Sequence, residues 1–139
     1  MNVVIDTNVL VAALRSNKGA SYRLLSWLPH GRYTPNISVP LFLEYEAVLK
    51  REGMAPTLDS VDIDAVLDFV LSKSRIRKIY FLWRPFLRDL KDDHLLEVAV
   101  ASNSKYIVTF NVNDFRGIEK FGVKAVTPQE YLKLTGIMK

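Results

Sequence analysis

Several carboxylate side chains lie at positions of the sequence where a metal ion could use them. Asp6 directly follows the apolar run 3–5, and Glu44 lies inside an apolar segment with the spacing of a helix. Hard cations such as Mg²⁺ and Mn²⁺ take oxygen ligands and bind through a few carboxylates while keeping several waters. Such an ion can activate water for attack on a phosphodiester. These acids therefore indicate a divalent-metal site.

Glu44 differs from its neighbour Glu46 in what surrounds it. Glu46 has Lys50 four residues later, which offers it an ordinary ion pair on a helix surface. Glu44 has mostly apolar residues at helical spacing and no nearby cation. An acid beside an apolar stripe usually needs a metal or a hydrogen-bond donor as its partner. We therefore expect Glu44 to belong to the site.

The densest acidic cluster, Asp89, Asp92 and Asp93, lies at the start of a predicted helix. Capping of that helix explains one of the three. Asp92 has apolar residues three, four and seven positions later, so we expect its side chain on the inward face. Asp93 points about a third of a turn away. Asp92 is therefore the preferred ligand, and Asp93 is the second choice.

A further polar group, Asn111, Asn113 and Asp114, follows the predicted strand 106–109. A polar turn is a sufficient explanation for Asn113. Asp114 carries a carboxylate to the edge of the sheet where we expect Asp6, so it is the better ligand candidate.

The elements that must position these residues alternate between strands and helices. This pattern predicts a mostly parallel sheet with helices on both faces, and a site at the carboxyl ends of the strands near the switch in strand order. The predicted strands are 3–5, 33–39, 76–82, 106–109 and 123–126, and the predicted helices are 9–14, 20–28, 40–49, 59–72, 92–102 and 128–134.

Two of these helices carry more detailed predictions. The last one begins with Thr127 as N-cap, Pro128 in the first turn and Glu130 closing a capping box. The helix over 59–72 has an amphipathic pattern. Its predicted buried stripe consists of Val61, Val66, Phe69 and Val70.

The composition is that of an ordinary folded protein. A length of 139 residues predicts a single domain over 1–139. The chain has no cysteine, which excludes disulfides, thiolate zinc sites and cysteine nucleophiles and fits a reducing cytoplasm. We expect no signal peptide and no membrane span, because the start of the chain lacks a basic region and no apolar run approaches about 20 residues.

The net charge of +4 and the pI near 9.4 favour polyanionic partners slightly. Basic and aromatic residues alternate over 75–91, which could provide phosphate contacts and stacking surfaces. A solvated strand edge whose aromatic rings face the core explains the same pattern. The residues are Arg75, Arg77, Lys78, Arg84, Arg88 and Lys91, with Tyr80, Phe81, Trp83 and Phe86 between them.

Four motifs in this order resemble the PIN-domain family: the strand and turn over 3–11, Glu44 inside its helix, the acidic segment 88–99 and Tyr-Ile-Val-Thr at 106–109. The resemblance covers nearly the whole chain. It is closest to the bacterial and archaeal branch described as toxin components of toxin–antitoxin pairs. It implies a three-layer α/β/α Rossmann-like sandwich with a central, mostly parallel sheet of about five strands.

The resemblance also implies an activity and a set of site residues. The activity is an endoribonuclease that depends on Mg²⁺ or Mn²⁺, acts on RNA and leaves a 5′-phosphate and a 3′-hydroxyl. Members commonly form homodimers, and the toxins pair with a small antitoxin. By motif position, Asp6, Glu44 and Asp92 are the first three acids, with Asp93 adjacent, and Thr7, Asn8 and Thr109 support them.

The sequence departs from the family at the fourth acid, because many relatives have Asp where this chain has Asn111. Asp114 is the candidate replacement, and without it the site has three acids. One alternative function is therefore an RNA-binding module with weak or no catalysis. A second is a receiver or phosphatase type of protein with Asp6 as nucleophile. The second is disfavoured because Lys105 precedes its strand, whereas that chemistry needs a lysine after one.

Overall fold

A five-stranded sheet forms the centre of the computed structural model, which describes residues 1–79, 87 and 89–138. The strand order is β3-β2-β1-β4-β5, and every neighbouring pair is parallel. The predicted parallel sheet of about five strands is therefore confirmed. The strands are β1 (Asn2–Ile5), β2 (Thr34–Ile37), β3 (Arg75–Ile76), β4 (Tyr106–Val108) and β5 (Lys124–Val126).

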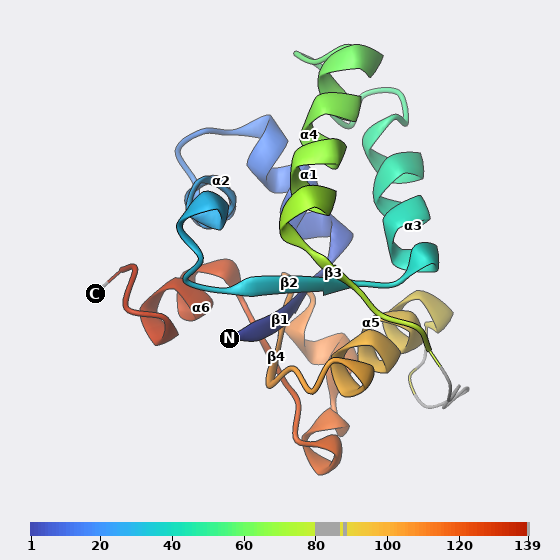
Figure 1. Ribbon diagram of the computed structural model, residues 1–139, viewed down its shortest axis with the longest axis vertical. Helices are drawn as coiled ribbons and strands as arrows, with labels where there is room; N and C mark the ends of the chain where they lie inside the picture. Colours follow the sequence, from blue (N-terminus) through green and yellow to red (C-terminus); the bar gives the residue numbers. More distant parts are fainter. Residues whose placement is uncertain (80–86, 88, 139) are drawn as a thin grey trace.

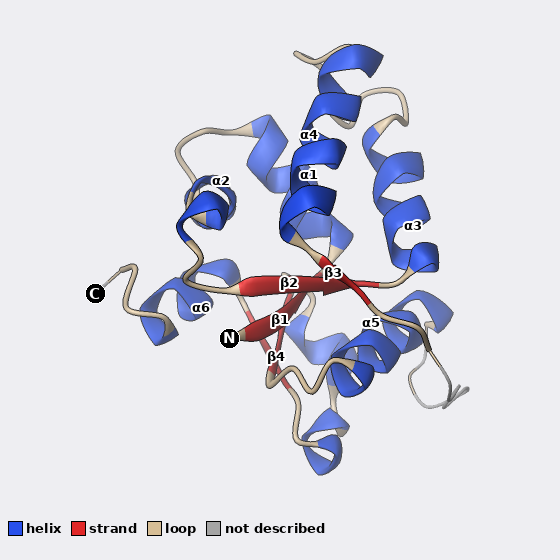
Figure 2. Ribbon diagram, viewed as in Figure 1, coloured by secondary structure: helices blue, strands red, loops and turns tan. Residues whose placement is uncertain are grey.

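Helices cover both faces of this sheet, as predicted. Helices α1, α3 and α4 lie on one face and α5 lies on the other (Figure 1), and Figure 2 shows the same view with the strands in red. The helices are α1 (Thr7–Arg15), α2 (Ala20–Ser26), α3 (Val39–Leu49), α4 (Ser60–Lys73), α5 (Leu90–Ala101) and α6 (Pro128–Leu134), and the short 3-10 helices are η1 (Leu28–His30), η2 (Val112–Phe115) and η3 (Ile118–Phe121). No helix in the described ranges is long and apolar enough to cross a membrane.

The strand order changes direction at β1 and β4. The chain runs from β1 through β2 to β3 at one edge, and later from β4 to β5 at the other. Val3, Val4 and Ile5 are buried because β1 is central and covered on both faces. The carboxyl ends of β1 and β4 therefore lie side by side, and Asp6 and Thr109 are the residues that directly follow them. This is the location that the sequence predicts for the site.

Several predicted boundaries differ from the structure by one or more residues. The strand predicted over 33–39 ends at Ile37, because Ser38 is the N-cap of α3 and its hydroxyl accepts from the Leu41 amide at 3.2 Å. The helix predicted over 20–28 ends at Ser26 and is followed by η1, which Gly31 closes with φ of 69°. Of the strand predicted over 76–82, residues 77–79 are not strand and 80–82 lie outside the described residues.

The predicted buried stripe of α4 is wrong at two positions. Val61 is 75% exposed and Phe69 is 36% exposed. The residues that α4 buries are Ile63, Leu67 and Val70, which follow one another at helical spacing. Apolar residues occur on more than one side of α4, so the sequence of the helix does not determine which side is buried. Packing against neighbouring elements decides this.

The start of α6 confirms the predicted capping box. The Thr127 hydroxyl accepts from the Glu130 amide at 3.2 Å, and the Glu130 carboxylate accepts from the Thr127 amide at 3.1 Å. Thr127→Ala removes the cap, so we expect it to lower the free energy of unfolding by about 1 kcal/mol in urea denaturation. Thr57→Ala, in an exposed turn, is the control. Equal stability of the two variants would contradict the assigned cap.

Candidate metal centre

Asp6 follows β1 and bonds through its side chain to Thr109, which follows β4, at the switch in strand order. It occupies the N-cap position of α1, which is the ordinary role of such a residue, but its Oδ2 atom accepts a hydrogen bond from the Thr109 hydroxyl at 2.8 Å. Burial raises the pKa of Asp6; the Thr109 bond lowers it by less, and the nearby charge of Glu44 raises it further. Asp6 is therefore a buried carboxylate whose charge is poorly compensated by the protein.

Thr109 is buried and forms three hydrogen bonds, one of which orients the Asp6 carboxylate. It has no exposed surface, and its amide donates to the Val126 carbonyl at 2.9 Å. Its hydroxyl donates to Asp6 and accepts from the Asn111 amide at 3.0 Å. The role of Asn111 in the described contacts is thus carried by its backbone, while its side chain is exposed.

Glu44 reaches the same place from α3. Its Oε2 atom accepts from the hydroxyl of Thr7, the residue after Asp6. The adjacent Tyr45 is buried, and its hydroxyl donates to the Ile5 carbonyl, which ties α3 to the end of β1. Glu44 therefore has the polar partner that its apolar surroundings required.

The charges of this region also affect Tyr45. Its pKa is raised well above the usual value by burial first and then by the charges of Asp6 and Glu44. Glu46, by contrast, pairs with Lys50 at 3.5 Å, as its spacing predicted. The two glutamates of α3 thus have different surroundings, and Glu44 alone faces Asp6.

Asp92 lies in the first turn of α5 and is half-buried. Burial first, and then the charges of Asp6, Asp89, Asp114 and Asp93 in that order, together raise its pKa to about 7. Like charges have this effect only when they lie close together. The structure therefore brings Asp6 and Asp92 into one acidic cluster, with Asp114 contributing from η2.

The other two acids of the group Asp89, Asp92 and Asp93 accept hydrogen bonds from backbone amides. Asp89 is the N-cap and accepts from the Lys91 amide at 2.9 Å, so capping explains this residue. Asp93 is 1% exposed, and its Oδ1 accepts from the Leu87 amide at 2.7 Å. We expected Asp92 to be the inward residue, but Asp93 is more deeply buried because its carboxylate turns to the buried Leu87 amide. Asp92 is the acid that remains open to the cluster.

These acids share one edge of the sheet without forming a finished ligand cage. Within the described ranges, no three His, Cys, Asp or Glu side chains converge closely enough to hold one ion together. The donor set nevertheless fits a hard cation, because it consists of carboxylates whose charges repel one another. Asp6, Glu44 and Asp92 are the residues best placed for such an ion, with Asp114 exposed nearby.

The basic and aromatic segment 75–91 is only partly described. Residues 80–86 and 88 lie outside the described residues. They include all four aromatic residues of the segment and two of its basic residues, Arg84 and Arg88. Arg77 has a structural role: its Nε atom donates to the buried Asn36 side chain at 2.8 Å, and its amide donates to the Ile37 carbonyl. Lys78 and Lys91 are exposed.

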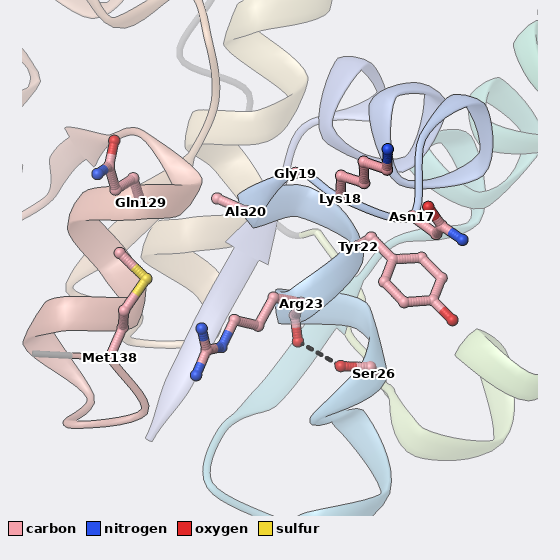
Figure 3. Close-up of a pocket in the computed structure, with 9 residues that line it drawn as sticks. All are labelled: Asn17, Lys18, Gly19, Ala20, Tyr22, Arg23, Ser26, Gln129 and Met138. Atoms are coloured by element: carbon pink, nitrogen blue, oxygen red, sulfur yellow. Dashed lines mark hydrogen bonds between the residues drawn. The ribbon is translucent and has the colours of Figure 1, made fainter.

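A cavity of about 540 Å³ lies elsewhere, between α2 and the end of the chain (Figure 3). Its lining has the basic residues Lys18 and Arg23 and no acidic residue. Figure 3 also shows the Ser26 hydroxyl donating to the Arg23 carbonyl at 2.8 Å. This cavity is therefore no alternative location for a metal ion.

Comparison with known proteins agrees with this fold. A chain of the crystal structure of VapBC2 from Rickettsia felis, bound to a DNA fragment from their promoter, is similar in fold with a TM-score of 0.63 and 20% sequence identity, over 91% of this chain and 98% of that one. No curated protein is significantly similar in sequence. Residues 2–113 match the family described as PIN domain. Because this match spans β1, β4 and every acid considered above except Asp114, the chain belongs to the PIN-domain family.

Proposed function

We propose that this protein is a Mg²⁺- or Mn²⁺-dependent endoribonuclease. The observation that carries the proposal is the pair of hydrogen bonds at the switch in strand order, from Thr109 to Asp6 and from Thr7 to Glu44. These bonds hold two carboxylates from distant segments at one edge of the sheet. Membership of the PIN-domain family supports the same reading.

The roles of the residues follow from their surroundings. Asp6, Glu44 and Asp92 would hold the ion, with Asp114 as a fourth acid. Asp93 is the second choice for the third acid, because its Oδ1 accepts from the Leu87 amide while its buried Oδ2 has no hydrogen-bond partner among the described residues. The carboxylates would be oriented by hydrogen bonds from supporting residues, which are Thr7, Asn8, Thr109 and the backbone of Asn111.

When bound, the ion would supply charge neutralisation at the phosphate and an activated water. The residues around the site differ in burial, and this determines where a substrate can reach the ion. Burial around Asp6 excludes bulk water from one side of the site, while the exposed Asp114 and half-buried Asp92 leave the other side open. The phosphate of an RNA strand would therefore approach from the side of α5 and η2.

The test is cleavage of single-stranded RNA by the purified protein, with and without Mn²⁺ and with a chelator. We expect products with a 5′-phosphate and a 3′-hydroxyl, and no cleavage by Asp6→Asn or Glu44→Gln. Cleavage that persists after chelation, or in both variants, would refute the assignment of these carboxylates. Salt-sensitive RNA binding without any cleavage would instead identify the RNA-binding module, the alternative that the Asn111 departure raises.

We also propose that the protein is the toxin of a toxin–antitoxin pair, forms homodimers and acts in the cytoplasm. The resemblance of motifs 3–11 and 88–99 to that branch of the family supports this, as does the similarity in fold to a chain of VapBC2. A small reading frame next to the gene, whose product binds this protein and inhibits RNA cleavage, is the expected finding. A protein that is not inhibited by any adjacent product, and whose expression leaves growth unchanged, would contradict the toxin role.

Thr109 provides a test of the supporting residues. Thr109→Val removes the donor to Asp6 and the acceptor for the Asn111 amide, so we expect the affinity for Mn²⁺ to fall by about 10- to 100-fold. Thr109→Ser keeps the hydroxyl and should retain most of the affinity. Calorimetric titration with Mn²⁺ measures both. Equal affinities for the two variants would show that the hydroxyl does not position Asp6.

A further inference from the structure

An exposed aromatic ring lies directly beside the acidic cluster. Phe110 is 50% exposed, and it stands between Thr109, which bonds to Asp6, and Asn111, whose amide bonds to Thr109. Its own amide faces the Asn8 carboxamide oxygen at 3.5 Å. The backbone of Phe110 is therefore held between residues that support the carboxylates.

The exposure of Phe110 contrasts with the strand that leads to it. Ile107, Val108 and Thr109 have no exposed surface. A phenylalanine at the end of such a strand would gain free energy by joining the core, because burial of an aromatic ring is strongly favourable. The chain instead places this ring in solvent at the edge of the sheet that carries the acids.

Two other aromatic side chains in the described ranges are similarly exposed, but they lie elsewhere. Tyr22 on α2 is 45% exposed and Phe69 on α4 is 36% exposed. Neither helix begins at the carboxyl ends of β1 and β4, where Asp6 and Thr109 are found. Phe110 is thus an exposed ring that the topology brings to the candidate centre.

We propose that Phe110 stacks on an unpaired nucleobase of the RNA substrate, next to the phosphate that is cleaved; this rests on the proposed ribonuclease function. Phe110 directly follows Thr109, whose hydroxyl donates to Asp6, and the Phe110 amide donates to Asn8 Oδ1 at 3.5 Å, so the exposed ring leaves the backbone at the edge that carries the carboxylates. Phe110 is therefore placed to contact a base flanking the site, and the phosphate is left to the carboxylates.

This contact selects for single-stranded RNA. Proteins stack aromatic rings on bases that are splayed out of a helix, whereas bases inside a duplex are already stacked on each other. The ring contributes no hydrogen bonds, so it distinguishes unpaired from paired RNA without reading the identity of the base. The substrate that fits this edge of the sheet is thus a single RNA strand with an unstacked base beside the scissile bond.

The test compares cleavage kinetics of the full chain with Phe110→Ala, Phe110→Leu and Phe110→Trp on a single-stranded RNA. Loss of base stacking should raise KM by about 10-fold or more for Phe110→Ala and Phe110→Leu, with kcat within about twofold, and Phe110→Trp should restore KM. Tyr22→Ala, another exposed aromatic residue, is the control and should change neither constant.

A second substrate tests the contact directly. An RNA with one abasic nucleotide beside the cleavage site should raise KM for the wild-type chain and cause no further loss in Phe110→Ala. An unchanged KM in Phe110→Ala would overturn the proposal, as would full activity of Phe110→Leu, since a leucine side chain cannot stack. A loss of dimer mass in Phe110→Ala with unchanged KM would also overturn it and would assign the ring to an interface between copies.

Failure of the ribonuclease function gives a different result. If the wild-type chain cleaves no RNA, equilibrium binding of the same RNA still measures Phe110, because stacking needs no metal. Affinity that falls in Phe110→Ala and returns in Phe110→Trp would then support the stacking contact and refute only the catalytic proposal. Binding that is the same in all three chains would refute the contact.

Discussion

Asp6→Asn is expected to lower the rate of RNA cleavage at saturating Mn²⁺ by about three orders of magnitude, because loss of a metal ligand removes several kcal/mol of transition-state stabilisation. Asparagine keeps an acceptor for the Thr109 hydroxyl, so the fold at the switch in strand order should persist. Single-turnover cleavage with excess protein measures the chemical step without product release.

The control for this prediction is Asp68→Asn. Asp68 is exposed on α4, and its substitution changes the net charge of the chain by the same amount. We expect its cleavage rate to match the wild type within about twofold, because a surface charge away from the site is screened. A similar fall in both variants would mean that overall charge, and not a ligand at Asp6, controls the rate.

The Asp6 variant should also remain well folded. Burial and the charge of Glu44 raise the pKa of Asp6, so the ionised carboxylate is a destabilising group at neutral pH. Its neutral replacement should melt at the same temperature as the wild type or above it in the absence of metal. A large fall in melting temperature would show that Asp6 stabilises the fold and would weaken any conclusion from its activity.

Asp92→Asn is expected to abolish cleavage and at the same time to stabilise the metal-free protein at pH 8. The pKa of Asp92 is raised to about 7 by burial and then by the charges of Asp6, Asp89, Asp114 and Asp93. Removing its charge relieves that repulsion. Because Asp92 is half-exposed, solvent screening limits the effect to about 1 kcal/mol, or about 3 °C in melting temperature.

The pH dependence of this gain has a definite sign. In the unfolded chain Asp92 titrates near 3.8, whereas in the folded chain it titrates near 7. The folded protein therefore binds an extra proton between these values, and its stability falls as pH rises from about 4 to about 7. The variant lacks this fall, so the two melting curves should coincide near pH 3.5 and differ fully at pH 8.

Added Mn²⁺ should reverse the order of the two proteins. A ligand that binds the folded state raises its melting temperature, and the rise grows with the logarithm of the affinity, so the wild type should gain more than Asp92→Asn. Thermal unfolding at pH 8 with and without Mn²⁺ measures this. If the wild type is the more stable protein without metal at pH 8, the assigned repulsion is wrong.

The sheet and its switch in strand order could be predicted from sequence because their signals are local. The apolar run of β1 and the Tyr-Ile-Val-Thr segment each mark a buried strand followed by polar residues, and parallel strands place those polar residues at one edge. The sequence therefore predicts that Asp6 and Thr109 lie at the same edge, where their side chains form a hydrogen bond at 2.8 Å. The capping box of α6 is predictable for the same reason, since Thr127 and Glu130, only three positions apart, define it.

The parts that could not be predicted depend on packing between distant segments. The depth of Asp93 is set by the amide of Leu87, and the buried stripe of α4 is chosen by its neighbours among several apolar residues. The partner of Glu44 was expected to exist, but its identity as Thr7 depends on how α3 docks against α1. Periodicity within one helix contains no information about these contacts.

The hydrogen bond from Thr109 to Asp6 spans 103 positions of the sequence. During synthesis, Asp6, Glu44 and Asp92 all leave the ribosome before the residue that fixes the first of them. At about 5–20 residues per second, β4 becomes available to complete the sheet only several seconds after β1 has been made. A nascent chain would therefore hold an unassembled centre for most of its translation.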